Sequence, residues 1–156
     1  MSDFIEEIHA FLRTVNAETR CVNINGHQAQ YYLHKYWPES HHNAFFEDEQ
    51  PIINSLLSTL TTDDVFYDIG GHFGQYACLA SAILPSEQVY TFEPDSFRQA
   101  IIRRNLSLNG RHVNIIGKAL SDEEGIGPTP NITGDEFVED GNPAPTVIKM
   151  DIEGSE

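Results

Sequence analysis

Basic residues are scarce in this sequence of 156 residues. Lysine and arginine together number 9, against 24 aspartates and glutamates, so the formal net charge is −15. Such a surface repels phosphate backbones and anionic lipid head groups, and we therefore expect neither nucleic acid nor membrane as a partner. The lysines are Lys35, Lys118 and Lys149. An acidic, lysine-poor surface suits a salt-rich, halophilic cytoplasm, where salt screens the self-repulsion, but it also suits an ordinary acidic protein.

Cysteine is nearly absent as well. The two cysteines, Cys21 and Cys78, form no CxxC motif and exclude a disulfide framework, which favours a reducing compartment. The amino-terminal stretch MSDFIEEIHAF is acidic and has no signal-peptide core, and no apolar run approaches the length of a membrane span. We therefore predict a cytoplasmic protein.

Hydrophobic residues make up 40% of the chain, enough for the core of one domain. Apolar residues recur at helical spacing between residues 4 and 15, which predicts an amphipathic helix that packs on the domain. A helix that binds a partner is the alternative. Cys21–Ile24 and Tyr31–Tyr36 flank Asn25-Gly26, and this pattern predicts a hairpin of two short strands.

The stretch from Trp37 to Pro51 is polar and irregular. His41 and His42 are adjacent, and adjacent side chains rarely converge on one metal ion without further ligands, so we predict no metal site. Pro51 suits a first helical turn, and the apolar residues that follow predict a helix that ends near residue 60.

The rest of the chain is organised around DIGGHFG, Asp68 to Gly74. The apolar run Val65–Tyr67 precedes it and a helical pattern follows, so the segment predicts a strand, a glycine-rich turn and a helix N-terminus. Glycines let the backbone approach a ligand, and a helix N-terminus offers free N–H groups. This is typical of a nucleotide or nucleoside cofactor site, although the glycines alone are also consistent with a tight turn.

A second apolar strand, Val89–Phe92, ends in Glu93, Pro94 and Asp95. In βαβ cofactor sites an acidic residue at this position accepts hydrogen bonds from the ribose hydroxyls, and a solvated strand-end acid is the alternative. Asp95 or Ser96 can cap the next helix, and Val113–Ile116 is a third predicted strand. Strands that alternate with helices predict a parallel sheet.

The segment 121–146 is rich in Gly, Pro, Asp and Glu, and we expect an insertion with at most a hairpin and a short helical turn. The chain then ends in TVIKMDIEGSE, in which 147–152 is predicted to be a buried parallel strand. Lys149 and Asp151 interrupt it, and buried charges require partners. Asp151 falls at the same sheet edge as Asp68 and Glu93, so three acids would define one crevice.

Four motifs occur in this order: VFYDIGGHFGQYA, VYTFEPD, NLSLNG with ALSDEEG, and KMDIEGSE. Together they resemble those of the FkbM-type methyltransferases, a family with the class I S-adenosylmethionine-dependent fold, and the likeness runs from about residue 45 to the end. The resemblance implies an α/β, Rossmann-like fold with a parallel sheet flanked by helices, in strand order 3-2-1-4-5-7-6. We expect strands one to four here, with strands five to seven missing and an amino-terminal helix and hairpin added.

The expected organisation is therefore a region 1–60 packed on a partial methyltransferase domain, 61–156. Strand four would form an open edge, at which self-association or a partner chain is expected. The resemblance also implies S-adenosylmethionine as cofactor and methyl transfer to a hydroxyl of a small molecule: a sugar, glycoside or secondary metabolite.

Site residues follow from the resemblance, position by position. The implied cofactor-binding residues are Asp68, Gly70, Gly71, His72, Gly74, Glu93, Pro94, Asp95 and Ala119, with Glu93 on the ribose and Ala119 near the adenine. The implied catalytic residues are Lys149, Asp151 and Glu153. We favour Asp151 as the group that orients or deprotonates the acceptor, and its alternative is a structural acid paired with Lys149.

Two other functions remain open. A nicotinamide-dinucleotide domain is disfavoured because His72 stands where its G-x-G-x-x-G fingerprint requires a second glycine. A non-catalytic module, or one half of a split methyltransferase, would keep the fold or the cofactor affinity without methyl transfer by this chain alone.

Overall fold

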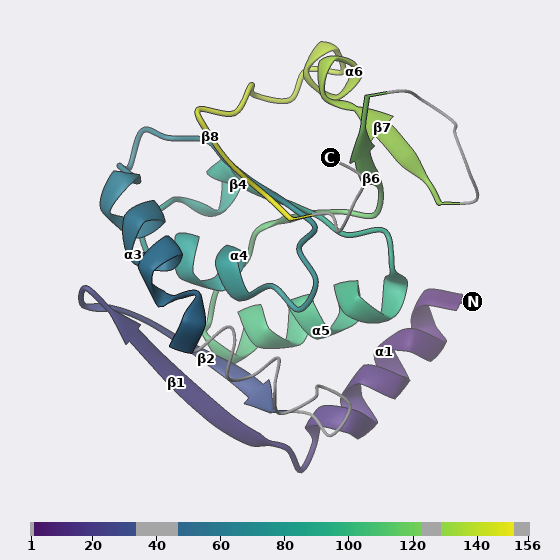
Figure 1. The fold of residues 1–156 in the computed structure, drawn as a ribbon. Coiled ribbons are helices and arrows are strands. Elements are labelled where there is room, and N and C mark those ends of the chain that lie inside the picture. The colour runs from purple at the N-terminus through teal and green to yellow at the C-terminus, as the bar shows by residue number, and fades with distance from the viewer. Residues whose placement is uncertain (1, 34–46, 123–128, 152–156) are drawn as a thin grey trace.

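A computed structural model describes residues 2–33, 47–122 and 129–151 of the chain (Figure 1). A single parallel sheet of four strands, in the order β5-β4-β3-β8, forms the centre. The elements, in chain order, are α1 (Ser2–Thr14), β1 (Glu18–Ile24), β2 (His27–Leu33), α3 (Gln50–Thr59), β3 (Phe66–Ile69), α4 (Gln75–Ala80), the 3-10 helix η2 (Ser86–Gln88), β4 (Val89–Phe92), α5 (Ser96–Leu108), β5 (Asn114–Ile116), β6 (Ala119–Ser121), β7 (Asn131–Thr133), α6 (Gly134–Glu139) and β8 (Val147–Met150).

The sheet confirms the predicted fold class, an α/β fold whose parallel sheet is flanked by helices. In sequence order the strands β3, β4, β5 and β8 are the predicted strands one to four, and their spatial order is the expected 3-2-1-4. None of the helices in the described ranges has the length and apolar character that crossing a bilayer requires.

Each face of the sheet is covered by different elements, because side chains alternate along a strand. Phe66 and Val89 face a large core that also takes residues from α1, the β1–β2 hairpin, α3, α4 and α5. Tyr67 and Tyr90 face the opposite way, onto a smaller core formed with β7 and α6. Figure 1 shows this division, with α6 on one side of the sheet and α1, α3, α4 and α5 on the other. The division of the chain at residue 60 stays a prediction.

The hairpin β1–β2 is confirmed, with longer strands than expected and with β2 beginning at His27 rather than near Tyr31. Asn25 and Gly26 form its two-residue turn with φ values of 53° and 87°. Positive φ at both turn positions matches the right-handed twist of the paired strands. The turn therefore starts pairing immediately at His27.

Regular helix α4 ends at Ala80, and residues 81–84 form tighter turns, such as Ile83 N–H to the Ala80 carbonyl at 2.9 Å, before Pro85. In the segment 121–146 the expected short helical turn is confirmed by α6, whereas the expected hairpin is wrong. Within 121–146, β7 pairs parallel with β6 rather than forming a hairpin. Thr133, at the end of β7, then caps α6.

Strand β8 lies at the edge of the sheet and is only half-buried, not buried as expected. Ile148 and Met150 are 52% and 53% exposed, whereas Lys149, on the other face, is directed towards the core side. In the described part of the chain β8 pairs with β3 alone. An edge strand is covered on fewer sides than a central one, which accounts for the difference.

The smaller core depends on Phe137 of α6. Its ring lies 5.1 Å from that of Phe92 and 5.8 Å from those of Tyr67 and Tyr90. We expect Phe137→Ala to lower the free energy of unfolding by about 3 kcal/mol, because it leaves a cavity among these rings. The control Ile52→Ala, at a 60% exposed position, is expected to change it by less than about 1 kcal/mol. Urea titration measures both, and equal losses would contradict this account.

Candidate functional site

The glycine turn after β3 folds back against the carboxyl end of β4. The N–H groups of Gly70 and Gly71 both donate to the Phe92 carbonyl, at 3.1 and 3.0 Å. Gly70 and Gly74 have φ values of 80° and 78°, which glycine adopts without strain. His72 also has a positive φ, of 50°. The backbone of the turn therefore lies directly against the end of the next strand.

Gly71 is required by space rather than by its backbone angles. A Cβ atom there would lie 2.0 Å from Thr91 Oγ1 of β4, far inside van der Waals contact. At Gly74 a Cβ would lie 3.0 Å from Ile102 of α5. The glycines thus allow the turn to pack closely against both β4 and α5. They are therefore needed for the tight turn itself, whether or not a ligand binds there.

Glu93, directly after β4, connects the glycine turn to the start of α5. One carboxylate oxygen accepts from the His72 N–H and the other from the Asp95 N–H, both at 2.9 Å, and Arg98 lies 3.9 Å away. The residue is 2% exposed, and burial raises the pKa of its carboxyl, while the two N–H donors and Arg98 oppose that rise. Its position between the turn and the start of α5 is the one that the sequence predicts for a ribose-binding acid.

Asp68 is the buried acid on the face of the sheet towards α4. Lys149 on β8 and Thr91 on β4 are its lateral neighbours, because the three occupy matching positions on adjacent strands. Lys149 Nζ lies 3.4 Å from Asp68 Oδ1, and Thr91 Oγ1 donates to Oδ2 at 3.4 Å. Oδ1 has no well-aligned hydrogen bond within the described residues, so its contact with Lys149 is mainly electrostatic. Burial raises the pKa of the Asp68 carboxyl, and the nearby Lys149 ammonium lowers it again in part.

Lys149 connects this acid to the edge of the sheet. Its ammonium donates to the Gly70 carbonyl at 3.3 Å and lies 4.0 Å from Asp151 Oδ2 and 4.8 Å from the centre of the Tyr76 ring. Asp151, at the end of β8, is 65% exposed at its side chain, unlike the two buried acids. The sheet edge thus carries a buried acid, a largely buried lysine and an accessible acid in one row.

The remaining predicted residues lie around this row or outside it. Asp95 caps α5, since its side chain accepts from the Arg98 N–H at 2.8 Å, and Pro94 lies between it and Glu93. Ala119 belongs to β6, where it pairs with Asn131, and its place near an adenine stays a prediction. Glu153, His41 and His42 lie outside the described residues.

Sequence reasoning missed Tyr76 and Thr91. Tyr76 contacts the Lys149 ammonium through its ring and donates its hydroxyl to Glu49 at 2.7 Å. Burial raises its pKa, and hydrogen bonding to Glu49 adds to that rise. A signal existed for Thr91 alone: it is the polar residue within the apolar run Val89–Phe92, and it pairs in register with Asp68 on the neighbouring strand.

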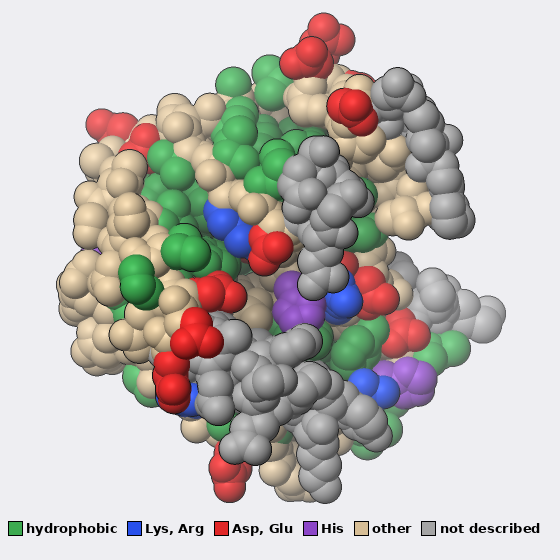
Figure 2. Space-filling view, in the orientation of Figure 1, with side chains coloured by type: hydrophobic (Ala, Val, Ile, Leu, Met, Phe, Trp, Pro, Cys, Tyr) green, Lys and Arg blue, Asp and Glu red, His purple; other side chains and the backbone are tan. Residues whose placement is uncertain are grey.

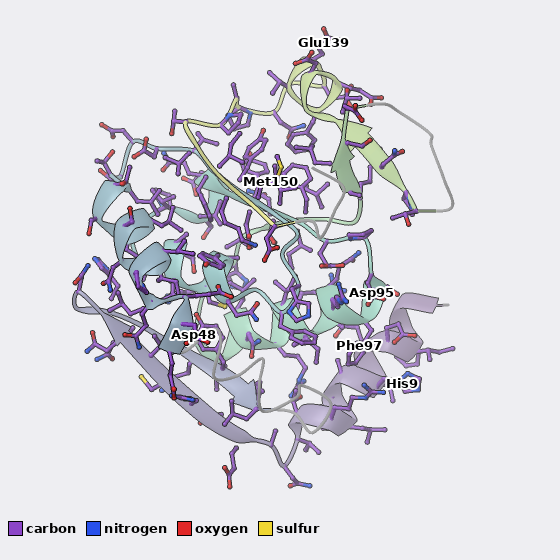
Figure 3. All side chains as sticks on the ribbon, viewed as in Figure 1. His9, Asp48, Asp95, Phe97, Glu139 and Met150 are labelled. Carbon is purple, nitrogen blue, oxygen red and sulfur yellow. The ribbon has the colours of Figure 1, made fainter. Side chains whose placement is uncertain are left out.

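The arrangement gathers charged groups at one edge of the sheet. Figure 2 shows acidic, basic and histidine side chains together near the middle of the viewed face, beside the point where β8 ends in Figure 1. Figure 3 marks that region by Met150 at the end of β8 and Asp95 at the start of α5. Carboxylates in such positions can accept hydrogen bonds from hydroxyls and attract a cationic group.

A comparison with curated proteins gives a relative of stated activity. The hexuronic acid methyltransferase AglP of Haloferax volcanii is 31% identical, over 69% of this chain and 53% of its own length. The chain therefore spans about half the length of the curated relative that it matches. No family model matches the chain, so the FkbM assignment stays a prediction.

Solved structures give weaker matches. The tRNA m1G37 methyltransferase of M. jannaschii has a TM-score of 0.44 at 14% identity, over 65% of this chain and 29% of that one. Trm5b of Pyrococcus abyssi has a TM-score of 0.45 at 15% identity, over 81% of this chain and 37% of that one. The exclusion of nucleic acid as a partner stays a prediction.

The packing of the turn can be tested at Gly71. We expect Gly71→Ala to lower the free energy of unfolding by about 2–3 kcal/mol, because its Cβ collides with Thr91. Thr91→Ala removes the colliding oxygen, so the double variant should lose less than the sum of the single losses. Gly134→Ala, where nothing lies within 4 Å, is the control. Additive losses in the urea titrations would contradict the proposed collision.

The pair Asp68–Lys149 predicts a pH-dependent loss of stability. In Lys149→Met the folded-state pKa of Asp68 rises further, because burial is no longer opposed by the ammonium. Above the ordinary Asp pKa of about 4, the folded variant then binds protons that the unfolded chain has released, so its stability falls as the pH rises. We expect a loss of about 3 kcal/mol near pH 8 and a clearly smaller loss near pH 5.

Urea unfolding at both pH values measures this difference. Lys118→Met, at an exposed position, removes the same charge and is expected to change stability little at either pH. If the stability loss in Lys149→Met is the same at both pH values, the Lys149 charge does not affect the pKa of Asp68.

Proposed function

We propose that this chain carries the cofactor-binding part of an S-adenosylmethionine-dependent methyltransferase. The observation that carries the proposal is Glu93, a strand-end acid hydrogen-bonded at 2.9 Å to the glycine turn through His72 and to the start of α5 through Asp95. An acidic residue in this position supports the proposal, because such a residue next to a glycine-rich turn is typical of sites that bind ribose hydroxyls. The 31% identity to a hexuronic acid methyltransferase supports the same function.

In this proposal the cofactor is held by the turn and by the acids that flank it. Each Glu93 oxygen accepts from one backbone N–H, and a carboxylate oxygen can accept a further hydrogen bond, which in this proposal comes from a ribose hydroxyl. Gly70, Gly71, His72 and Gly74 shape the methionine and ribose end next to Asp68, with Pro94 and Asp95 behind Glu93. Ala119 borders the adenine.

When bound, S-adenosylmethionine supplies an electrophilic methyl group on a cationic sulfonium. Asp151 is the accessible acid at this edge, and in our proposal it orients the acceptor hydroxyl and takes its proton. Lys149 lies 4.0 Å from Asp151 and 3.4 Å from the buried Asp68, whose charge it neutralises. Glu153 is assigned to the same crevice on the resemblance alone.

The acceptor in this proposal is a small molecule that carries a hydroxyl, with a sugar as the first choice. The name of the Haloferax relative points to a hexuronic acid, and an exposed acid at the sheet edge suits an acceptor whose proton must leave. Hexuronic acids and their glycosides are therefore the first acceptors to assay.

Calorimetric titration with S-adenosylmethionine, S-adenosylhomocysteine and NAD tests the cofactor. We expect binding of the first two and not of NAD, a loss of at least about tenfold in affinity in Glu93→Ala and Glu93→Gln, and little change in Asp151→Asn. Glu139→Ala, an exposed acid on α6 labelled in Figure 3, is the matched control. Circular dichroism of each variant separates lost binding from lost folding.

Two results would reject the proposal in different ways. If the folded parent chain binds neither S-adenosylmethionine nor S-adenosylhomocysteine, the cofactor site is wrong. If it binds both but transfers no methyl group to any acceptor, the chain is a binding module, and methyl transfer requires something that it does not supply.

A further inference from the structure

Helix α1 directs its apolar side away from the body of the protein. Six large apolar side chains along it are each between 42% and 69% exposed, and we call them the α1 stripe: Phe4, Ile5, Ile8, Phe11, Leu12 and Val15. The sequence predicts that this side of the helix packs on the domain. The structure shows the opposite orientation, which is the largest departure from the sequence expectation.

The other side of α1 is attached to α5 through polar contacts and through two arginine–ring contacts, in which Arg13 lies 4.5 Å from the centre of the Phe97 ring and Arg104 lies 5.1 Å from the centre of the Phe11 ring. Glu7 pairs with Arg103 at 2.5 Å, and the Thr14 hydroxyl accepts from Arg104. Ala10 is fully buried between them. Figure 1 shows α1 lying along α5, and Figure 3 marks His9 on α1 and Phe97 on α5. These contacts fix which side of the helix faces outward.

The α1 stripe has the spacing of a helix that packs against another helix. Phe4, Ile8, Phe11 and Val15 follow one another at intervals of four, three and four residues, the a/d pattern of a heptad, and Ile5 and Leu12 widen it. Val15 is still held by a helical hydrogen bond from its N–H to the Phe11 carbonyl at 2.8 Å. The order of these intervals is the same from either end, which suits a two-fold axis across the helix.

We propose that the α1 stripe is the contact surface for a second copy of this chain, with the two α1 helices antiparallel. The stripe exposes on the order of 500 Å² of apolar surface, as much as the largest patch on a typical monomer. Two such stripes bury roughly 1,000 Å², which is the lower limit for a specific contact and fits a weak, concentration-dependent dimer. Antiparallel pairing also aligns the helix dipoles favourably and brings the acidic start of one helix near Arg13 at the end of the other.

The charge of the protein gives this contact a characteristic salt dependence. Each copy carries a formal charge of −15, so two copies repel each other at low ionic strength. Salt screens this repulsion and leaves the apolar contact intact. The dimer should therefore strengthen as salt is added, whereas a contact based on ion pairs would weaken.

Sedimentation velocity of the 156-residue chain, between about 1 and 100 µM in about 0.1 M and 2 M NaCl, tests the proposal. We expect a monomer–dimer equilibrium that shifts at least about tenfold towards dimer at high salt. Phe4→Glu with Leu12→Glu, at positions 69% and 63% exposed, is expected to stay monomeric with unchanged circular dichroism. A parent chain that is monomeric throughout this range would overturn the proposal.

The charge-matched control is Ile52→Glu with Ile148→Glu, which adds two charges at positions 60% and 52% exposed on α3 and β8. We expect it to dimerise as the parent does. If this variant is monomeric while the Phe4/Leu12 variant dimerises, the chains associate elsewhere, as at the open edge of β8, and the α1 proposal is wrong.

The antiparallel arrangement is tested by cross-linking. In such a pair Ile8 of one copy faces Phe11 of the other. In a Cys21→Ser background, Ile8→Cys chains are mixed with Phe11→Cys chains. Disulfides that join one chain of each kind should then outnumber disulfides that join two identical chains. A predominance of Ile8→Cys pairs and Phe11→Cys pairs would show parallel helices and overturn this arrangement.

Discussion

The close approach of the glycine turn to strand β4 is the constraint on which the candidate site depends. Gly71 leaves no room for a side chain because Thr91 stands 2.0 Å from where a Cβ would be. At that distance the N–H groups of Gly70 and Gly71 reach the Phe92 carbonyl, and the next N–H, that of His72, reaches Glu93. One missing side chain thus allows a run of hydrogen bonds that fixes the turn, the end of β4 and the start of α5 relative to one another.

Three acids at the same sheet edge have different environments, and these suggest different tasks. Glu93 is buried and bonded to backbone N–H groups, and Asp68 is buried beside a single ammonium, so burial raises the pKa of both. Asp151 is exposed. In a chain with so few lysines, Lys149 is notable because it contacts two of these acids as well as the Gly70 carbonyl and the Tyr76 ring. The Lys149 ammonium offsets part of the desolvation cost of the buried Asp68 carboxylate, where the strands β3 and β8 end.

Polar contacts and exposed apolar area also decide how helix α1 lies on the surface. Polar contacts with Arg103 and Arg104 hold α1 on the body, so its apolar residues face outward. The proposed association of two copies uses α1, which is separate from the sheet edge that carries the acids. The cofactor proposal and the association proposal are therefore independent.

The sequence by itself determined the sheet and the acids at its edge. The apolar runs before Asp68 and after Gln88, the glycines between them and the Asp95 cap are local signals, and short-range physics was sufficient to place β3, β4 and α5. The strand order came from the resemblance to a known family. Only the tertiary structure decided which side of α1 faces α5, that β6 pairs parallel with β7, and that Tyr76 and Thr91 join Asp68 and Lys149. These outcomes depend on contacts between residues far apart in the chain. Helical periodicity reveals that α1 has an apolar side but not what that side meets, because the polar partners that turn it outward lie about ninety residues later.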